Sequence, residues 1–151
     1  GITTAEDSRI AIEHGVDVVY ISNHGGRSLD HARGTIQALP EIKEAVGGKA
    51  KVIIDGGFVR GTDVLKALAL GAEAVCMGRL QAWAVAAGGA AGLIRALEIL
   101  EEEIIVNMGL LGVTKLEQLA PSYVSPAEPV VPPHPLSAFP VALERITEGR
   151  D

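Results

Sequence analysis

Short apolar runs alternate with amphipathic segments along the first two thirds of the chain. Residues 17–22 (DVVYIS), 51–54 (KVII) and 74–77 (AVCM) form apolar runs that are too short for helices. Their lack of polar alternation is typical of parallel strands that are buried on both faces. The sequence therefore predicts parallel strands near 17–22, 51–55 and 74–78.

Helices are predicted before and between these strands. Thr3 and Glu6 have the spacing of a capping box ahead of a first helix, and Gly15 has the place of the residue that ends it. A second helix is expected over 35–46, and Pro40 should interrupt it early.

The next helices surround the third strand. Thr62 is the predicted cap of a helix that Gly71 closes. Residues 81–87 are expected to form a short helix ahead of the pair at 88–89, and a longer helix is expected after it. Its apolar positions share one face: Leu93, Leu97, Leu100, Ile104 and Met108. The run Glu101–Glu103 is expected on the solvated face, with little functional meaning.

The character of the chain changes after residue 111. Residues 114–119 are expected to form one helical turn, and residues 121–140 hold seven of the eight prolines. Such a segment cannot form a regular core element. We interpret 1–119 as the main domain and 120–151 as a Pro-rich arm over a neighbouring surface or a disordered tail.

The alternation of strands and helices predicts an α/β fold with right-handed βαβ units and a parallel sheet. Such units could be the C-terminal part of a (β/α)8 TIM barrel, which typically needs about 250 residues. A small doubly wound sheet is the alternative, but no G-x-G-x-x-G pattern follows the first strand. Because the chain opens on Gly1 without a methionine, we expect sequence upstream that completes the barrel.

Composition narrows the functional classes. The net charge of −6 argues against a nucleic-acid surface, which needs clustered Lys and Arg. The single cysteine, Cys76, cannot form an internal disulfide, so a reducing, cytoplasmic location is predicted. No run of about 18 apolar residues free of charge or Gly is present, so no membrane span is expected. No Cys/His pair has the spacing of a metal site.

Each predicted strand ends in a polar or glycine-rich cluster, at 22–27, 55–61 and 78–79. In a barrel these clusters meet at the C-terminal face, where active sites lie. Gly56, Gly57 and Arg79 would form an anion cradle there, since glycines let backbone N–H groups approach a phosphate. The plainer interpretation is that these glycines only make left-handed turns.

The first cluster holds a different pair of groups. A neutral histidine is a suitable general base near pH 7, and arginine binds carboxylates in a bidentate way. His24 and Arg27 lie three residues apart on a loop with two glycines, so they could face one cavity. Alternatively, His24 stabilises the loop and Arg27 is a surface charge.

Several linked motifs resemble one family. SNHGGR (22–27), DGGFVRGTDVLKALALGA (55–72), MGR (77–79) and MGLLGVTKLEQL (108–119) are similar in order and spacing to the FMN-dependent 2-hydroxy-acid oxidases and dehydrogenases. That family includes glycolate oxidase, lactate oxidase, cytochrome-type lactate dehydrogenase and mandelate dehydrogenase. The resemblance, which covers residues 1 to about 119, implies a (β/α)8 barrel with FMN at its C-terminal mouth.

The resemblance also implies roles for single residues. His24 matches the catalytic base that takes a proton from a small L-2-hydroxy acid, and Arg27 matches the arginine that binds the substrate carboxylate. The implied FMN contacts are Ser22, Asp55, Gly56, Gly57, Phe58, Val59, Gly78 and Arg79. The product would be a 2-oxo acid, and the electron acceptor would be oxygen, a quinone or a cytochrome. Family members are often tetramers.

Two departures from the family pattern matter. Many relatives carry two arginines where this chain has Val59 and Arg60, so a phosphate contact is lost and weaker FMN retention is expected. The phosphate would then depend on Arg79 and on backbone N–H groups near Val59. The family also has a flavin-contacting lysine directly before the Gly-Ile that opens this chain. We therefore expect residues 1–151 alone to be inactive. The alternatives are another FMN- or phosphate-binding barrel enzyme and a non-catalytic half barrel.

Overall fold

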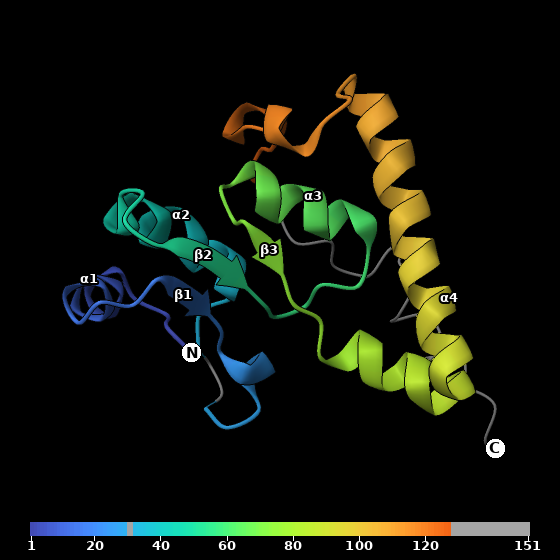
Figure 1. The fold of residues 1–151 in the computed structure, drawn as a ribbon, viewed down its shortest axis with the longest axis horizontal. Coiled ribbons are helices and arrows are strands. Elements are labelled where there is room, and N and C mark those ends of the chain that lie inside the picture. The colour runs from blue at the N-terminus through green and yellow to red at the C-terminus, as the bar shows by residue number, and fades with distance from the viewer. Residues whose placement is uncertain (30–31, 128–151) are drawn as a thin grey trace, which may run out of the picture.

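The computed structural model describes residues 1–29 and 32–127. Its strands are β1 (Val18–Ile21), β2 (Lys51–Ile54) and β3 (Ala74–Val75), which form one parallel sheet in the order β1-β2-β3. Its α-helices are α1 (Ala5–Glu13), α2 (Thr35–Val46), α3 (Gly61–Ala69) and α4 (Arg79–Leu111). Short 3-10 turns are η1 (His24–Gly26), η2 (Leu116–Gln118) and η3 (Pro121–Tyr123). Figure 1 shows α1 beside α2, and α3 alongside α4.

One face of the sheet packs against α2 to make the core. Val19 and Ile21 of β1 and Val52 and Ile54 of β2 are almost fully buried. The α2 side chains packed in the same cluster are Ala38, Leu39, Ile42 and Val46. Tyr20 and Val18, which point to the opposite face, are 38% and 42% exposed. The prediction of strands buried on both faces is therefore wrong for the described residues, because no described element covers this second face.

The sheet extends beyond β1 by a single residue. Ile2 forms a parallel bridge with Ile21, donating its N–H to the Tyr20 carbonyl at 2.9 Å and accepting from the Ser22 N–H at 3.3 Å. The first residues of the chain therefore lie where a further strand would end. This arrangement brings the start of the chain to the carboxyl end of β1.

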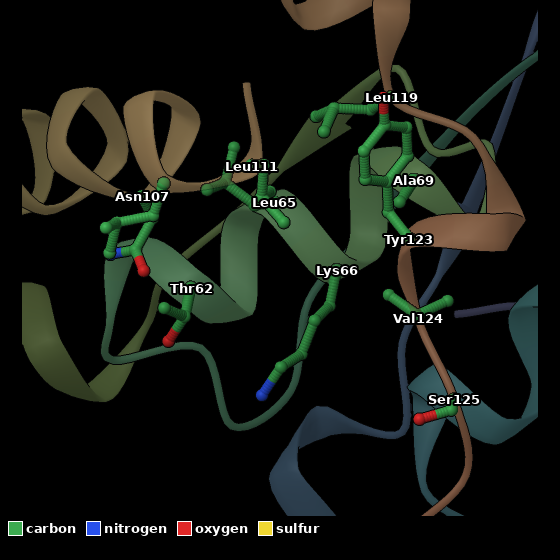
Figure 2. Close-up of a pocket in the computed structure, with 11 residues that line it drawn as sticks. Thr62, Leu65, Lys66, Ala69, Asn107, Leu111, Leu119, Tyr123, Val124 and Ser125 are labelled. Carbon is green, nitrogen blue, oxygen red and sulfur yellow. The ribbon is translucent and has the colours of Figure 1, made fainter. Parts of the chain in front are cut away.

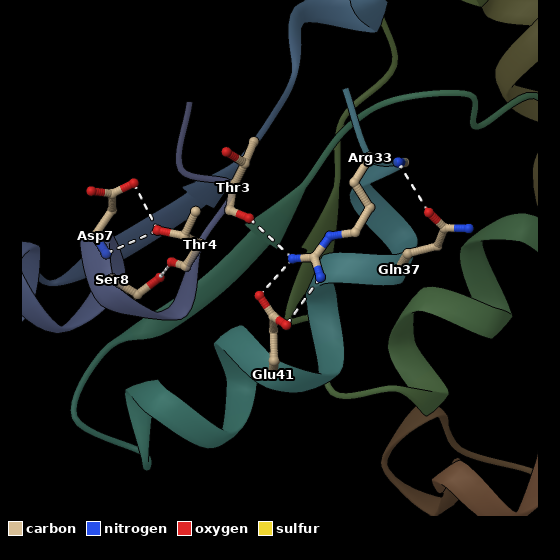
Figure 3. A network of polar contacts seen from close by, with 8 residues as sticks. Thr3, Thr4, Asp7, Ser8, Arg33, Gln37 and Glu41 are labelled. Atoms are coloured by element: carbon tan, nitrogen blue, oxygen red, sulfur yellow. Dashed lines mark hydrogen bonds and ion pairs between the residues drawn. The ribbon is translucent and has the colours of Figure 1, made fainter. Parts of the chain in front are cut away.

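The N-terminal cap of α1 lies one residue later than predicted. The Thr4 hydroxyl, rather than Thr3, accepts from the Asp7 N–H at 3.1 Å and donates to the Asp7 carboxylate at 2.8 Å (Figure 3). Gly15 follows the helix with a φ of 80°, as expected. A threonine caps α1 as predicted, but of the two neighbouring threonines the second one, Thr4, is the N-cap.

Arg33 links the start of the chain to α2. Its guanidinium donates to both oxygens of Glu41, at 3.0 and 2.5 Å, and to the Thr3 carbonyl at 3.2 Å (Figure 3). The hydrogen bonds from Arg33 hold the pKa of the Glu41 carboxyl below its usual value. Helix α2 runs without a break through Pro40, whose exposed ring lies on the solvent side, so the predicted interruption is wrong.

Helix α4 bends at the predicted glycine pair. The backbone leaves helical angles at Gly88 (φ −157°, ψ 22°) and Gly89 (φ 58°, ψ −142°), and the two arms are otherwise continuous from Arg79 to Leu111. A Cβ on Gly92 would collide with the Ala84 carbonyl, so only glycine allows the arms to approach here. The first arm begins at Arg79 rather than at residue 81.

The second arm of α4 is largely exposed and apolar. By length and composition alone, α4 could cross a membrane. An 18-residue stretch of it has a mean hydropathy of 1.4, and 6% of that stretch is buried. These two criteria are weak, and the helix is broken at Gly88–Gly89. The expectation that the chain has no membrane span stays a prediction.

The segment after α4 folds back onto α3. The turn expected over 114–119 is the 3-10 turn η2, and the Gln118 side chain accepts from the Thr114 and Lys115 N–H groups at 2.7 and 2.9 Å. The turn η3 then packs against α3. The Pro-rich segment therefore begins with a packed turn, and the arm or tail predicted beyond it lies outside the described residues from 128 onwards.

Candidate active site

The turn after β1 places His24 at the carboxyl end of the sheet. His24 is the one non-glycine with a positive φ, 54°, among the described residues, and its side chain is exposed. Asn23 shapes the turn, because its side-chain oxygen accepts from the Gly25 N–H at 2.9 Å and its amide donates to the Arg33 carbonyl at 3.2 Å. A left-handed histidine is uncommon, and such strain is found most often at functional positions.

Ser22 and Arg27 lie at the two ends of this turn. The Ser22 hydroxyl accepts from the His24 N–H at 3.2 Å, and the Arg27 N–H donates to the His24 carbonyl at 3.2 Å. Because His24 and Arg27 are one 3-10 turn apart, both side chains leave the same short segment. The Arg27 side chain is exposed, as is that of His24.

Asp55 follows β2 directly and is held at several atoms. Its N–H donates to the Ile21 carbonyl at 3.0 Å, and its own carbonyl accepts from the Thr35 hydroxyl at 2.5 Å. One carboxylate oxygen, Oδ2, accepts from the Tyr20 hydroxyl at 2.8 Å. The other, Oδ1, is buried and has no hydrogen-bond partner. Buried polar atoms are rarely left unpaired, so this oxygen is suited to a ligand donor.

The two glycines after Asp55 differ in what surrounds them. Gly56 has a φ of 105°, and a Cβ built there would lie 2.6 Å from the Thr35 hydroxyl oxygen. Gly57 has a φ of 86°, but no atom lies within 4 Å of its Cβ position. Gly56 is thus required both by backbone angle and by space, whereas Gly57 faces an opening. Phe58, the next residue, is 6% exposed and belongs to the core.

The loop from Val59 to Gly61 is closed by carboxylates of the chain itself. Asp63 accepts from the Val59 and Arg60 N–H groups at 3.1 and 3.0 Å. Glu103 accepts from the Gly61 N–H at 2.6 Å and from the Arg60 guanidinium at 2.7 Å. The Val59 N–H, which we expected to be available to a phosphate, is therefore already paired. The N-cap residue of α3 is Arg60 rather than the predicted Thr62, and Asp63 reaches back from the first turn of α3 to the Arg60 N–H.

Glu103 joins α4 to the start of α3, a role that its place in a run of three glutamates does not indicate. It comes from α4, and a Cβ on Gly61 would lie 2.6 Å from the Glu103 Cβ, so α3 and α4 touch at this point. Hydrogen bonds from Arg60 are the main reason that the pKa of the Glu103 carboxyl is lowered. The prediction that all of Glu101–Glu103 lies on a solvated face with little meaning is wrong for Glu103.

Arg79 brings the third strand end to the first. β3 ends at Val75, and Gly78 and Arg79 stand at the start of α4 a few residues later. No atom lies within 4 Å of a Cβ built on Gly78. A Cβ on Gly25 would lie 3.9 Å from the Arg79 guanidinium. The side chain of Arg79 therefore reaches over the β1 turn, and the predicted meeting of strand-end clusters takes place.

Tyr20 and Thr35 were not singled out from the sequence, although both contact Asp55. Burial removes water from the Tyr20 hydroxyl, and this raises its pKa. Its hydrogen bonds to Asp55 and Cys76 raise the pKa further. It therefore stays a proton donor at any physiological pH. An available signal was that a tyrosine stood in an otherwise aliphatic strand, where a hydroxyl needs a partner. Asn23 was also missed, although an Asn before His-Gly-Gly is a known turn former.

A separate cavity in the described part of the chain lies away from the strand ends. A cavity of about 360 Å³ opens between α3, the end of α4 and residues 119–125 (Figure 2). Its walls are mainly apolar, with Leu65, Leu111 and Val124 among them, and Lys66 is the cation at its edge. No predicted site residue lines it. Among the described residues no group of three or more His, Cys, Asp or Glu could hold a metal ion.

The fold is of the α/β class, with a parallel sheet whose first and third strand ends are brought together by Arg79. The family model "FMN-dependent dehydrogenase" matches residues 1–126. The chain belongs to this family, which confirms the resemblance seen in its motifs and the predicted fold class.

Named relatives agree with this assignment. The chain is 46% identical to an L-lactate oxidase from Nostoc sp. over 124 residues, which cover 82% of this chain and 34% of the relative. It is 53% identical to mouse (Mus musculus) 2-hydroxyacid oxidase 1 over 112 residues, covering 74% and 30%. A peroxisomal (S)-2-hydroxy-acid oxidase from Oryza sativa subsp. japonica is 50% identical over 82% of this chain and 34% of its own length. The chain thus spans about a third of these relatives.

A solved structure shows the same arrangement. A crystal structure of mandelate oxidase with a difluorinated hydroxyphenylpropionic acid superposes with a TM-score of 0.75 at 48% identity, over 78% of this chain and 35% of that chain. The parallel sheet of the present chain is therefore part of a (β/α)8 barrel fold. The cytoplasmic location expected from the single cysteine stays a prediction, since the rice relative is named as peroxisomal.

The residues present fit the family's cofactor in part. Asp55 offers a buried unpaired oxygen, Gly57 and Gly78 offer open backbone, and Arg79 offers a cation. If a flavin mononucleotide binds, the Asp55 oxygen would suit a polyol hydroxyl, and the open glycines with Arg79 would suit its phosphate. The Val59–Gly61 stretch does not add to the cradle, because Asp63 and Glu103 occupy its N–H groups.

Proposed function

We propose that this chain supplies the base and the carboxylate-binding arginine for the FMN-dependent oxidation of a small L-2-hydroxy acid to a 2-oxo acid. The carrying observation is the turn after β1. There a left-handed His24 leaves the sheet edge one turn before Arg27, and the Arg79 guanidinium lies beside the same turn. The names of the relatives, which are lactate, mandelate and other 2-hydroxy-acid oxidases, support the substrate class.

His24 is the proton acceptor in this proposal. A substrate alcohol loses two electrons and two protons when its C–O bond becomes a carbonyl. His24 would take one of these protons, either from the hydroxyl or from Cα. The two electrons and the other proton would pass to bound FMN, which supplies the redox chemistry. The Asn23 contacts fix the backbone of the turn from which the imidazole leaves.

Arg27 binds the substrate carboxylate. A guanidinium forms two parallel hydrogen bonds with a carboxylate, which fixes both the position and the orientation of the acid. Because Arg27 and His24 leave the same turn, a bound carboxylate places the neighbouring carbon near the base. This shared origin gives a physical reason for substrates with the hydroxyl on the carbon next to the carboxylate.

The cofactor is held by the other two strand ends. In the proposal Asp55 accepts from the polyol of FMN, and Gly57, Gly78 and Arg79 receive its phosphate. Ser22 lies beneath the ring system, where its hydroxyl already supports the His24 N–H. Gly56, Phe58 and Val59 shape the loop from within, and any direct contact of theirs with FMN stays a prediction.

Oxygen is the proposed electron acceptor, because the named relatives are oxidases. A quinone or a cytochrome is the alternative. Tetramer formation also stays a prediction.

An anaerobic reduction experiment tests the proposal. The complete gene product that contains this chain is purified, and its flavin absorbance is recorded before and after adding L-lactate, glycolate or mandelate without oxygen. We expect bleaching by at least one acid and its return when air is admitted. Bound FMN that none of the acids bleaches would favour another FMN-binding barrel enzyme. Absence of FMN binding would favour a non-catalytic half barrel. Residues 1–151 alone are expected to show no turnover.

A further inference from the structure

We propose that Tyr20 is a positioning residue for the cofactor site: its hydroxyl holds one oxygen of Asp55 so that the other faces a hydroxyl group of the bound flavin's polyol chain. The inference rests on the proposed function, because it requires that a flavin binds at this sheet edge. It adds a residue that none of the predicted site roles includes.

The strand register explains why Tyr20 reaches Asp55. Tyr20 pairs with Ile53, and Asp55 lies two residues further along, so both side chains point to the sheet face that the helices leave uncovered. Tyrosine is long enough to bridge this diagonal step, and its hydroxyl donates to Asp55 Oδ2 at 2.8 Å. An aliphatic residue in the same place could not make this contact.

The rest of Asp55 is fixed in the same way. The Thr35 hydroxyl donates to its carbonyl, and its N–H is bonded to Ile21, so the backbone cannot turn to present a different atom. With Oδ2 held by Tyr20, rotation of the carboxylate is also stopped. The buried Oδ1 is then left aimed at one place, without a partner. A buried unpaired carboxylate oxygen is costly, so a ligand donor there gains more than it would at an exposed site.

The chemistry of this oxygen selects the ligand group. A carboxylate accepts hydrogen bonds and repels a phosphate, so Asp55 suits a neutral hydroxyl and not the phosphate end of the cofactor. The phosphate belongs instead beside Arg79 and the open Gly78. The Tyr20 hydroxyl, with its raised pKa, remains a donor and does not compete for the same ligand proton.

Two flavins separate the polyol contact from the phosphate contact. The apoprotein of the complete gene product is titrated with FMN and with riboflavin, which share the polyol chain and differ in the phosphate, and quenching of flavin fluorescence gives each affinity. In Tyr20→Phe we expect both affinities to fall by about tenfold, since a charge-assisted contact loses its orientation. In Arg79→Gln only the FMN affinity should fall. Tyr123→Phe, the matched control in the distant turn η3, should change neither.

The partner variant tests whether Tyr20 acts through Asp55. In an Asp55→Asn background, Tyr20→Phe should have little further effect on either flavin, because the carboxylate that it orients is gone. Phenylalanine keeps the ring, and thermal unfolding of each apoprotein is followed by circular dichroism. Any loss of stability that Tyr20→Phe causes equally in both backgrounds cancels when its effects on flavin affinity in the two backgrounds are compared.

The outcomes are distinct. Wild-type binding of FMN together with a change of less than about twofold in Tyr20→Phe would overturn the inference and leave the proposed function intact. Equal losses from Tyr20→Phe in the wild-type and Asp55→Asn backgrounds would overturn it too, because Tyr20 would then act independently. If the wild-type protein binds neither flavin, the proposed function fails and this inference fails with it.

Discussion

The turn after β1 and the loop after β2 both follow parallel strands and both contain paired glycines, yet they treat their backbone groups differently. In the first, Asn23 satisfies the turn from within the same segment, and the His24 side chain is left exposed. In the second, Asp63 and Glu103 reach in from helices and bind the N–H groups of Val59 to Gly61.

The turn after β1 therefore presents a side chain, whereas the loop after β2 shapes an opening. A short turn that is satisfied locally can display a reactive side chain without involving the rest of the fold. A longer loop with several free N–H groups attracts any anion, and here the chain supplies its own anions at one end and leaves Gly57 open at the other.

The largest effect is expected at the exposed side chain of the first turn. His24→Gln should lower the rate of 2-hydroxy-acid oxidation by about 10²–10⁴-fold, because a positioned base contributes that much. FMN affinity should stay unchanged, since the turn is held by Asn23 and by backbone contacts. Steady-state kinetics and flavin absorbance measure the two quantities. His14→Gln, at the end of α1, is the control, and a similar loss of rate there would contradict the assignment.

Next in size is the difference between the two glycines of the second loop. Gly56→Ala should destabilise the protein by about 2–3 kcal/mol, because it adds a clash with Thr35 to a strained backbone angle. Gly57→Ala should cost only about 1 kcal/mol, the strain alone. Denaturant unfolding of both variants gives the comparison. Equal losses would show that the Thr35 contact yields and that Gly56 is needed for its angle only.

The carboxylate that closes the second loop should have a smaller, pH-dependent effect. Glu103→Ala should cost about 1–2 kcal/mol, discounted because its partner Arg60 is half-exposed. Glu101→Ala, two residues earlier on α4, is the control for helix propensity and net charge.

The sign of the pH dependence follows from the lowered pKa of Glu103. Its ordinary value is 4.5, and the folded value lies below that. The stabilisation is therefore complete above about pH 4.5 and is lost as the pH falls through the folded pKa. Urea unfolding at pH 7 and at lower pH should show the difference between wild type and Glu103→Ala shrinking with acidification. A difference that grows with acidification would contradict this role.

The smallest expected effect concerns the arginine that this chain lacks. Val59→Arg should tighten FMN binding by about fivefold, because it restores a cation near the phosphate without opening the Asp63 contacts. Val59→Gln, of similar length and no charge, is the matched control. Fluorescence titration of the apoprotein gives the affinity. If Val59→Arg binds FMN no more tightly than the wild type, side chain 59 does not limit FMN retention.

Much of the fold could be predicted from the sequence, because its signals are local. The apolar runs became β1, β2 and β3, and Gly15, Gly71 and the 88–89 pair lie where helices end or bend. The meeting of the strand-end clusters also followed from topology alone, since parallel strands present their carboxyl ends at one edge. The motifs then identified the family, and the match over residues 1–126 confirmed it.

What was missed depends on contacts between distant residues. Glu103 lies more than forty positions from Gly61, and nothing in a run of three glutamates shows which one turns inward. Tyr20 and Asp55 meet because of the register between β1 and β2. The sequence of one strand does not show how it is aligned with the next strand. The choice of Thr4 over Thr3 at α1 shows the same limit at short range, since only the folded path decides between adjacent caps.

The Glu103–Gly61 contact has a consequence for how the protein behaves in ordinary buffers. The N-terminus of α3 would otherwise attract sulfate or phosphate from solution, as helix N-termini do. With a carboxylate of α4 already seated there, the described part of the chain leaves Arg79 and its neighbouring glycines as the place where dissolved anions would compete with a flavin phosphate. Inhibition by inorganic phosphate should therefore follow a single-site curve.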